Sequence, residues 1–170
     1  DGMPVNMRTH AHGQGYTDIN FVIEELVERV EFVKGPVDAR IGDFSSAGGA
    51  HIRTFQRLPR GRLTLGVGEN GYGRVLAAGS EDFASGHVLG AFEGQVYDGP
   101  WTDIDEDVRK INGLAKLSHE NNVRRWAVTG MFYDNGGISH HNMSINDYAG
   151  HVTGMSLTGS GQEFTFTIGH

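Results

Sequence analysis

Hydrophobic and polar residues alternate with a period of two in several parts of the chain. In residues 62–68, leucine and valine at the odd positions alternate with arginine, threonine and glycine at the even positions. The same alternation recurs in residues 86–97, 125–133 and 163–168. Successive side chains of a strand point to opposite faces, and Asn, Gly and Asp between such runs favour turns. The pattern therefore predicts a mainly β fold of short antiparallel strands.

Two architectures fit this alternation. In a transmembrane β-barrel, lipid-facing and lumen-facing residues alternate, and aromatic residues gather near the strand ends, as Tyr97, Trp101, Trp126 and Tyr133 do here. A soluble β-sandwich alternates in the same way, because it hides one face of each sheet in its core. The period alone leaves both architectures open.

Residues 108–119 are ambiguous. Apolar residues that include Ile111 and Leu114 fit one face of a helix, and the acidic residues of segment 103–107 lie where a helix start favours acids. The alternation from Ile111 to Leu117 fits a strand equally well. Periodicity does not decide between the two.

A different order of signals precedes the alternating segments. Residues 28–34 mix charged and apolar side chains in a way that suits a short strand with one face buried and ionic partners on the other. Gly35-Pro36 ends this strand, because proline removes a hydrogen-bond donor and restricts the residue before it. Residues 37–41 then read as a single turn, residues 45–49 as a small-residue loop, and residues 50–55 as the start of a second strand.

This order of parts resembles the plug domain of TonB-dependent outer-membrane receptors. The segments that carry the resemblance are 27–31, 34–36, 38–42 and 47–54, with 1–5 and 13–16 upstream. Several spaced blocks in the same order are more specific than any one of them. The chain departs from the family at Glu24, where these plugs often carry proline, and at Val37, where an aromatic residue is common.

Later segments resemble the first barrel strands of the same receptors. They are residues 93–101, 110–116 and 126–135. On this resemblance we interpret the ambiguous residues 108–119 as a strand. The resemblance ends after Asn135.

The fold class that follows is mainly β: a small α+β plug segment, then antiparallel strands of an incomplete transmembrane β-barrel. Residues 1–57 are expected to form the C-terminal part of the plug, and residues 58–170 the first barrel strands, although 136–170 match no receptor segment. A membrane strand takes about 9–11 residues, so the second region has room for about seven strands, too few to close a wide barrel. Asp1 lies inside an apparent strand without an initiator methionine, so we expect a piece of a longer protein.

The resemblance also implies a function. In this family a plug fills a barrel of about 22 strands, binds a scarce nutrient and moves when an energised periplasmic partner pulls on it. We therefore expect a fragment of an outer-membrane receptor for active uptake of a siderophore, vitamin or carbohydrate. Its partners would be the nutrient, a TonB-type energising protein and outer-membrane lipid, with no cofactor. The alternative is a soluble β-sandwich binding module, which would stay monodisperse without detergent.

The resemblance places the polar, glycine-rich loop before residue 17 toward the external vestibule of the plug. His10, His12, Gln14 and Tyr16 would there contact the nutrient. A solvated loop without a ligand role remains the alternative.

A second candidate set consists of the cations of the plug segment. Arg29, Lys34 and Arg40 are spaced so that at least one faces away from the plug core. In the family, plug cations pair with carboxylates on the inner barrel wall. We therefore expect plug–barrel contacts at these three positions.

The composition of the chain argues against some kinds of partner and binding site. The 170 residues carry a net charge of −7 and no cysteine, which argues against nucleic acid as a partner and excludes disulfides and thiolate metal sites. Glycine is abundant at 26 residues, without a collagen period, which favours tight turns.

The remaining motifs predict no active site. Residues 66–71 match G-x-G-x-x-G, but a strand follows, so we interpret Asn70-Gly71 as a type I′ hairpin turn. The aspartates of segment 103–107 lack the glycine and the distal glutamate of a calcium loop. His10 and His12 share one strand face but have no further ligand nearby, so we predict no metal site.

A hydrolase that uses histidine and carboxylate remains as a minor alternative. It would pair His119 with Glu120 or His51 with Asp43. No nucleophile motif supports it, and we predict that the chain is not an enzyme.

Overall fold

The computed structural model describes residues 1–8, 14–84, 86–100, 105–121 and 125–137, together with the backbone of residues 152–159 and 162–168. The secondary structure is mainly β with antiparallel sheets, which confirms the predicted class at that level. The chain divides into two compact units, Asp1–Phe55 and Gln56–His170. Within the described ranges, no helix is long and apolar enough to span a membrane.

The first unit contains two short 3-10 helices and two strands: η1 (Glu24–Leu26), β1 (Val27–Lys34), η2 (Ala39–Ile41) and β2 (Gly48–Thr54). The second unit contains β3 (Arg62–Val67), β4 (Gly73–Phe83), β5 (Gly86–Tyr97), β6 (Val108–Glu120), β7 (Arg125–Gly136), β8 (Val152–Gly159) and β9 (Gln162–Ile168).

In the first unit, β1 and β2 pair antiparallel as a two-stranded ribbon that ends where Lys34 lies opposite Gly48. The predicted strand, single turn and second strand are confirmed, although β2 begins earlier than predicted. Gly48 has a φ of 120°, and a Cβ there would lie 2.0 Å from the carbonyl oxygen of Val33. The ribbon therefore requires glycine at this position.

The two faces of the ribbon differ in polarity, as the sequence predicts. Val30 and Phe32 share one face, whereas Arg29 and Glu31 lie on the other and form an ion pair at 2.8 Å. The predicted burial of the apolar face is wrong, because Val30 is 42% and Phe32 75% exposed. A two-stranded ribbon has no second layer of its own, so alternation here specifies sidedness without burial.

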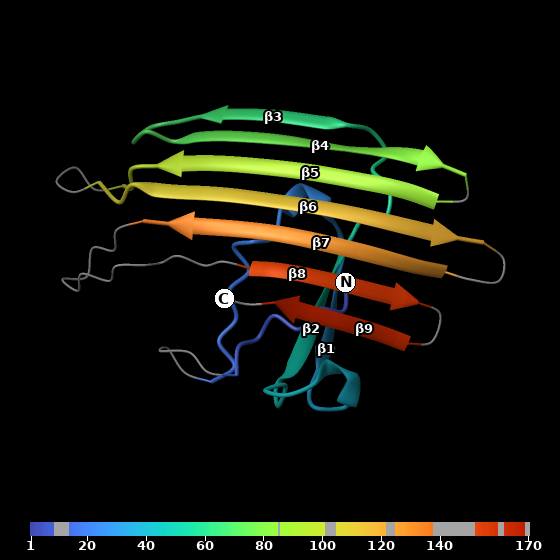
Figure 1. Cartoon of the computed structure of the whole chain (residues 1–170). Helices are drawn as coiled ribbons and strands as arrows, with labels where there is room; N and C mark the ends of the chain where they lie inside the picture. Colours follow the sequence, from blue (N-terminus) through green and yellow to red (C-terminus); the bar gives the residue numbers. More distant parts are fainter. Residues whose placement is uncertain are drawn as a thin grey trace. The chain divides into compact units, whose positions relative to one another are not determined.

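The second unit is a seven-stranded sheet in which each strand pairs antiparallel with its neighbour in sequence. Figure 1 shows β3 to β9 side by side in chain order, coloured from green to red. Of the inner strands, β4, β5, β6 and β7 have 11, 12, 13 and 12 residues, and β8 has 8. β6 spans the segment whose periodicity was ambiguous and pairs with β5 and β7 along its length, so the strand interpretation is confirmed.

A tight turn joins β3 to β4. Asn70 and Gly71 have φ values of 54° and 67°, both positive as a type I′ turn requires. The Tyr72 N–H donates to the Glu69 carbonyl at 3.1 Å and closes the turn. Strands flank the glycine-rich motif on both sides, so the hairpin interpretation is confirmed.

Cross-strand pairing sorts the side chains of this sheet onto two faces. One row consists of Leu76, Glu93, Asn112 and Tyr133. The adjacent row, on the opposite face, consists of Ala77, Phe92, Gly113 and Phe132. We call the first side the polar face; its polar members in the strand interiors include Arg74, Glu93, Lys110, Asn112, Lys116 and Thr129.

We call the second side the apolar face; it carries Val75, Val88, Phe92, Val96, Ile111, Leu117 and Phe132. On this face of the described strands β3 to β7, the Asp, Glu, Lys and Arg residues are Glu81, Arg109 and Asp134, all near strand ends. The central part of the face is therefore free of charge.

The connections between strands differ in length at the two ends of the sheet. At one end, residues 84–85, 121–124 and 160–161 join consecutive strands. At the other end the joining segments are residues 68–72, 98–107 and 137–151. An up-and-down sheet places alternate connections at opposite ends, and in this chain the connections at one end are shorter than those at the other.

Candidate functional site

A carboxylate with three partners lies in the interior of the polar face. Glu93 Oε1 accepts hydrogen bonds from Arg74 Nε at 2.7 Å and lies 2.6 Å from Arg74 Nη2. Its Oε2 lies 3.0 Å from Lys110 Nζ and accepts from Asn112 Nδ2 at 3.5 Å. We call these four residues the Glu93 cluster. The cluster joins β4, β5 and β6, because the register places Glu93 directly opposite Asn112.

The Glu93 cluster is buried. Glu93 and Asn112 are each 1% exposed, and the side chains of Arg74 and Lys110 are 12% and 17% exposed. A buried charge is tolerated when it is paired and hydrogen-bonded, and here two cations and an amide surround one carboxylate. The carboxylate of Glu93 contacts residues of the two neighbouring strands, so the buried cluster links β4, β5 and β6 on the polar face.

The two faces of the sheet differ in exposure. Lys116 on the polar face is 2% exposed, whereas Phe92 and Val96 on the apolar face are 50% and 49% exposed. The edge strand continues this trend, since Leu63 and Leu65 are 71% and 74% exposed. Charge is therefore hidden on one side of the sheet, and a broad hydrocarbon surface is open on the other.

The predicted ligand residues fall in the first unit. His10 and His12 lie outside the described residues, whereas Gln14 is exposed and Tyr16 half-buried. The Met7 N–H donates to the Tyr16 carbonyl at 2.7 Å, and the Gly15 N–H donates to the Met7 carbonyl at 2.8 Å. These bonds bring the two ends of the predicted loop together, so Gln14 and Tyr16 lie close to its base.

The predicted plug–barrel cations are spread over the first unit rather than gathered. Arg29 pairs with Glu31 of its own strand, Lys34 lies at the exposed end of β1, and Arg40 is exposed beside Asp38. Hydrogen bonds from the Arg40 side chain and backbone lower the pKa of Asp38 to about 2. Two of the three cations thus have partners within a few residues.

Of the two histidines considered for a hydrolase, His119 has contacts that the structure describes. The His119 ring stacks on Trp126 with ring centroids 5.5 Å apart, and its Nε2 lies 3.2 Å from Asn121 Nδ2. Among the residues that the structure describes, no group of three or more His, Asp or Glu side chains could hold a metal ion.

Two groups of contacts were not predicted from the sequence. One is the Glu93 cluster, and the other joins Arg57 to Asp82 and His87. The available signal was a charged residue at a mid-strand position: Glu93 stands in the middle of an alternating run whose other side is apolar. Its partners lie on other strands, so their identity depends on register.

No family model matches the sequence, and no solved structure matches the chain. The two faces of the sheet and its connections therefore carry the functional proposal.

Proposed function

We propose that the chain is part of a TonB-dependent outer-membrane receptor, with residues 1–57 as the C-terminal part of the plug and residues 58–170 as the first strands of the barrel wall. The observation that supports this most strongly is the polarity of the sheet: its apolar face is exposed and its polar face contains a buried charge cluster.

A membrane wall explains this polarity. Lipid contacts the outside of a transmembrane barrel, so the exposed face of Phe92, Val96 and Ile111 has the chemistry of a lipid-facing surface. The inside of such a barrel is polar, which suits Glu93 and Lys116. A soluble sandwich would need the apolar face as its core.

Strand length and connection length agree with this proposal. A strand needs about 9–11 residues to cross the hydrocarbon layer, and β4 to β7 reach 11 to 13 residues. Bacterial barrels have short turns on the periplasmic side and longer loops outside. On this basis the end of the sheet with residues 84–85 and 121–124 faces the periplasm, and the end with residues 98–107 faces outward.

The nutrient and the energising partner come from the sequence resemblance. We infer active uptake of a siderophore, vitamin or carbohydrate, with the plug gating the barrel lumen and a TonB-type protein supplying the pull. His10, His12, Gln14 and Tyr16 are the proposed nutrient contacts, and Arg29, Lys34 and Arg40 the proposed contacts with the wall.

Photolabelling from the lipid phase tests which face meets the membrane. A hydrophobic photoprobe dissolved in membranes that contain the intact receptor is expected to label Phe92 and Phe132 and to spare Glu93 and Gln95, as mapped by mass spectrometry of peptides. Labelling of the Glu93 side would reverse the assignment of faces. Labelling of neither side, with a protein that stays monodisperse without detergent, would favour the soluble binding module.

The nutrient site is tested separately. Replacing His10, His12 and Tyr16 together by alanine in the intact receptor is expected to weaken nutrient binding by at least roughly tenfold, since each lost hydrogen bond contributes on the order of 1 kcal/mol. Binding is measured with radiolabelled representatives of the three nutrient classes. Thr17→Ala, beside the loop, is the matched control and should bind as the unaltered receptor does. Unchanged affinity in the triple variant would reject these residues as the site.

A further inference from the structure

The segment that joins the two units is fastened to the sheet soon after it leaves the first unit. The Leu58 N–H donates to Ser80 Oγ at 3.0 Å, and the Ser80 hydroxyl donates to the Leu58 carbonyl at 3.3 Å. A serine hydroxyl both donates and accepts, so Ser80 serves both backbone groups of one residue, as a paired strand would. Leu58 is 8% exposed, so its side chain is buried as well.

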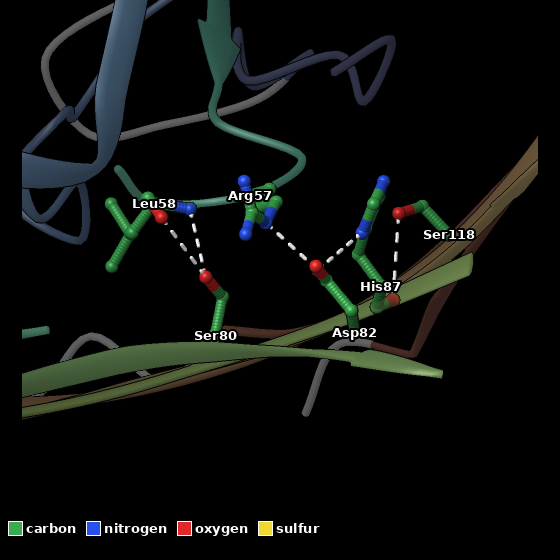
Figure 2. Close-up of polar contacts among 6 residues, drawn as sticks. All are labelled: Arg57, Leu58, Ser80, Asp82, His87 and Ser118. Carbon is green, nitrogen blue, oxygen red and sulfur yellow. Dashed lines mark hydrogen bonds and ion pairs between the residues drawn. The ribbon is translucent and has the colours of Figure 1, made fainter. Parts of the chain in front are cut away.

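An ionic contact lies beside this backbone contact. Arg57 Nε donates to Asp82 Oδ1 at 2.8 Å, and His87 Nδ1 lies 2.8 Å from the same oxygen. The Ser118 hydroxyl donates to the His87 carbonyl at 3.5 Å and continues the chain of contacts to β6. Figure 2 shows Ser80 and Asp82 on β4 pointing toward Leu58 and Arg57, with His87 on the far side of Asp82.

All of these sheet residues lie on the polar face at the end with the short connections. Asp82 is directly opposite His87, and His87 is directly opposite Ser118. Successive side chains on β4 alternate, so Ser80 and Asp82 share a face while Glu81 lies on the other. This end of the polar face thus presents a hydroxyl, from Ser80, and a carboxylate, from Asp82, to the segment that contains Arg57.

We propose that Arg57 and Leu58, held by Ser80, Asp82 and His87, form a latch that fixes residues 56–61 to the sheet and isolates the edge strand β3 from tension in the chain that precedes it. β3 has six residues and pairs with β4 at the edge of the sheet. A pull that arrives through the chain would otherwise act at Arg62 and peel β3 from that edge. The latch transfers the pull to β4 and β5, which lie inside the sheet and pair on both sides.

The latch can open without unfolding the sheet. The side chains of Arg57 and Asp82 are 56% and 54% exposed, and exposed ion pairs of this kind contribute little to stability. The β4–β5 ladder is built from backbone pairing that runs from Gly73–Val96 to Phe83–Gly86 without the latch residues of the linker. The proposal concerns the linker and the sheet only, and it holds whether or not the sheet lies in a membrane.

Hydrogen exchange measured by mass spectrometry tests the latch in the intact protein. Ser80→Ala is expected to speed exchange in peptides from residues 56–61 by roughly fivefold, the effect of losing one hydrogen bond, while peptides from β5 and β6 keep their rates. Glu81→Gln is the matched control: it changes the neighbouring side chain on the opposite face and should leave residues 56–61 unchanged.

A second variant keeps the sheet itself unaltered. Arg57→Gln removes the ionic half of the latch from the linker side, and it is expected to raise the rate of tryptic cleavage after Arg60 at least twofold. Unchanged exchange and unchanged cleavage in both variants would overturn the latch. Faster exchange spread equally over β4, β5 and β6 would also overturn it, because it would show a general role in sheet stability.

Discussion

Arginine in place of Phe92 is expected to prevent assembly of the proposed receptor into the outer membrane. Phe92 lies at the middle of β5, on the apolar face, beside Ala77 and Gly113. If that face meets lipid, the guanidinium sits near the midplane, where arginine costs roughly 2–4 kcal/mol. The small neighbours offer no partner for the charge. The measurement is the fraction of receptor that migrates as a folded, heat-modifiable barrel in membranes.

Phe92→Leu is the control, because it shortens the side chain and keeps it apolar. This variant should assemble nearly as well as the unaltered receptor. Efficient membrane assembly of Phe92→Arg would contradict the lipid-facing assignment. Unfolding of a water-soluble, detergent-independent protein by the same substitution would point to a sandwich core instead.

Removal of the carboxylate at the centre of the Glu93 cluster is expected to destabilise the protein by about 3–5 kcal/mol. Glu93→Ala leaves Arg74 and Lys110 cationic, close together and buried, with their shared counter-charge gone. The free energy of unfolding is measured by denaturant titration of the folded protein in detergent micelles. The expected loss is large because the remaining charges are desolvated and repel each other.

Two further variants separate this effect from a simple loss of volume. Glu81→Ala removes an exposed carboxylate from the other face of the neighbouring strand and should change stability by less than about 0.5 kcal/mol. The triple variant Arg74→Met, Glu93→Leu, Lys110→Met replaces all three charges by apolar groups and should recover most of the stability. A loss below about 1 kcal/mol for Glu93→Ala would show that water reaches the cluster.

Local pattern predicted much of the second unit. The alternation of residues 86–97 and 125–133 matches β5 and β7, and Asn70-Gly71 marks the turn at which β3 meets β4. These features depend on a few consecutive residues, so a sequence contains them directly. The strand nature of β6 needed the resemblance, because apolar residues of the segment, such as Ile111 and Leu114, also recur at the spacing of a helix face.

The partners of Glu93 could not be predicted from local pattern. Residues 98–107 separate β5 from β6, so the register that brings Lys110 and Asn112 to Glu93 depends on how that long connection closes. A shift by one residue would have moved both side chains to the other face. The contacts of Arg57 were missed for a related reason. The sequence around Arg57 has no pattern that indicates which strand it contacts, so Asp82 could not be named as its partner.

The ribbon of the first unit shows a further limit. Its alternation predicts the two faces correctly, but Phe32 is exposed because burial depends on a second layer. Periodicity reports which side chains share a face. It does not report what covers that face.

The strand order of the seven-stranded sheet also sets the way in which the sheet can form. Each strand pairs with the one that precedes it in the chain, so every pairing step closes a short loop and loses little conformational entropy. The sheet can therefore lengthen by one hairpin at a time, with each completed edge acting as the template for the next strand. Until that strand arrives, the edge is open to pairing with another molecule. The order of the strands along the chain is thus also the order in which neighbouring strands can be added to the sheet.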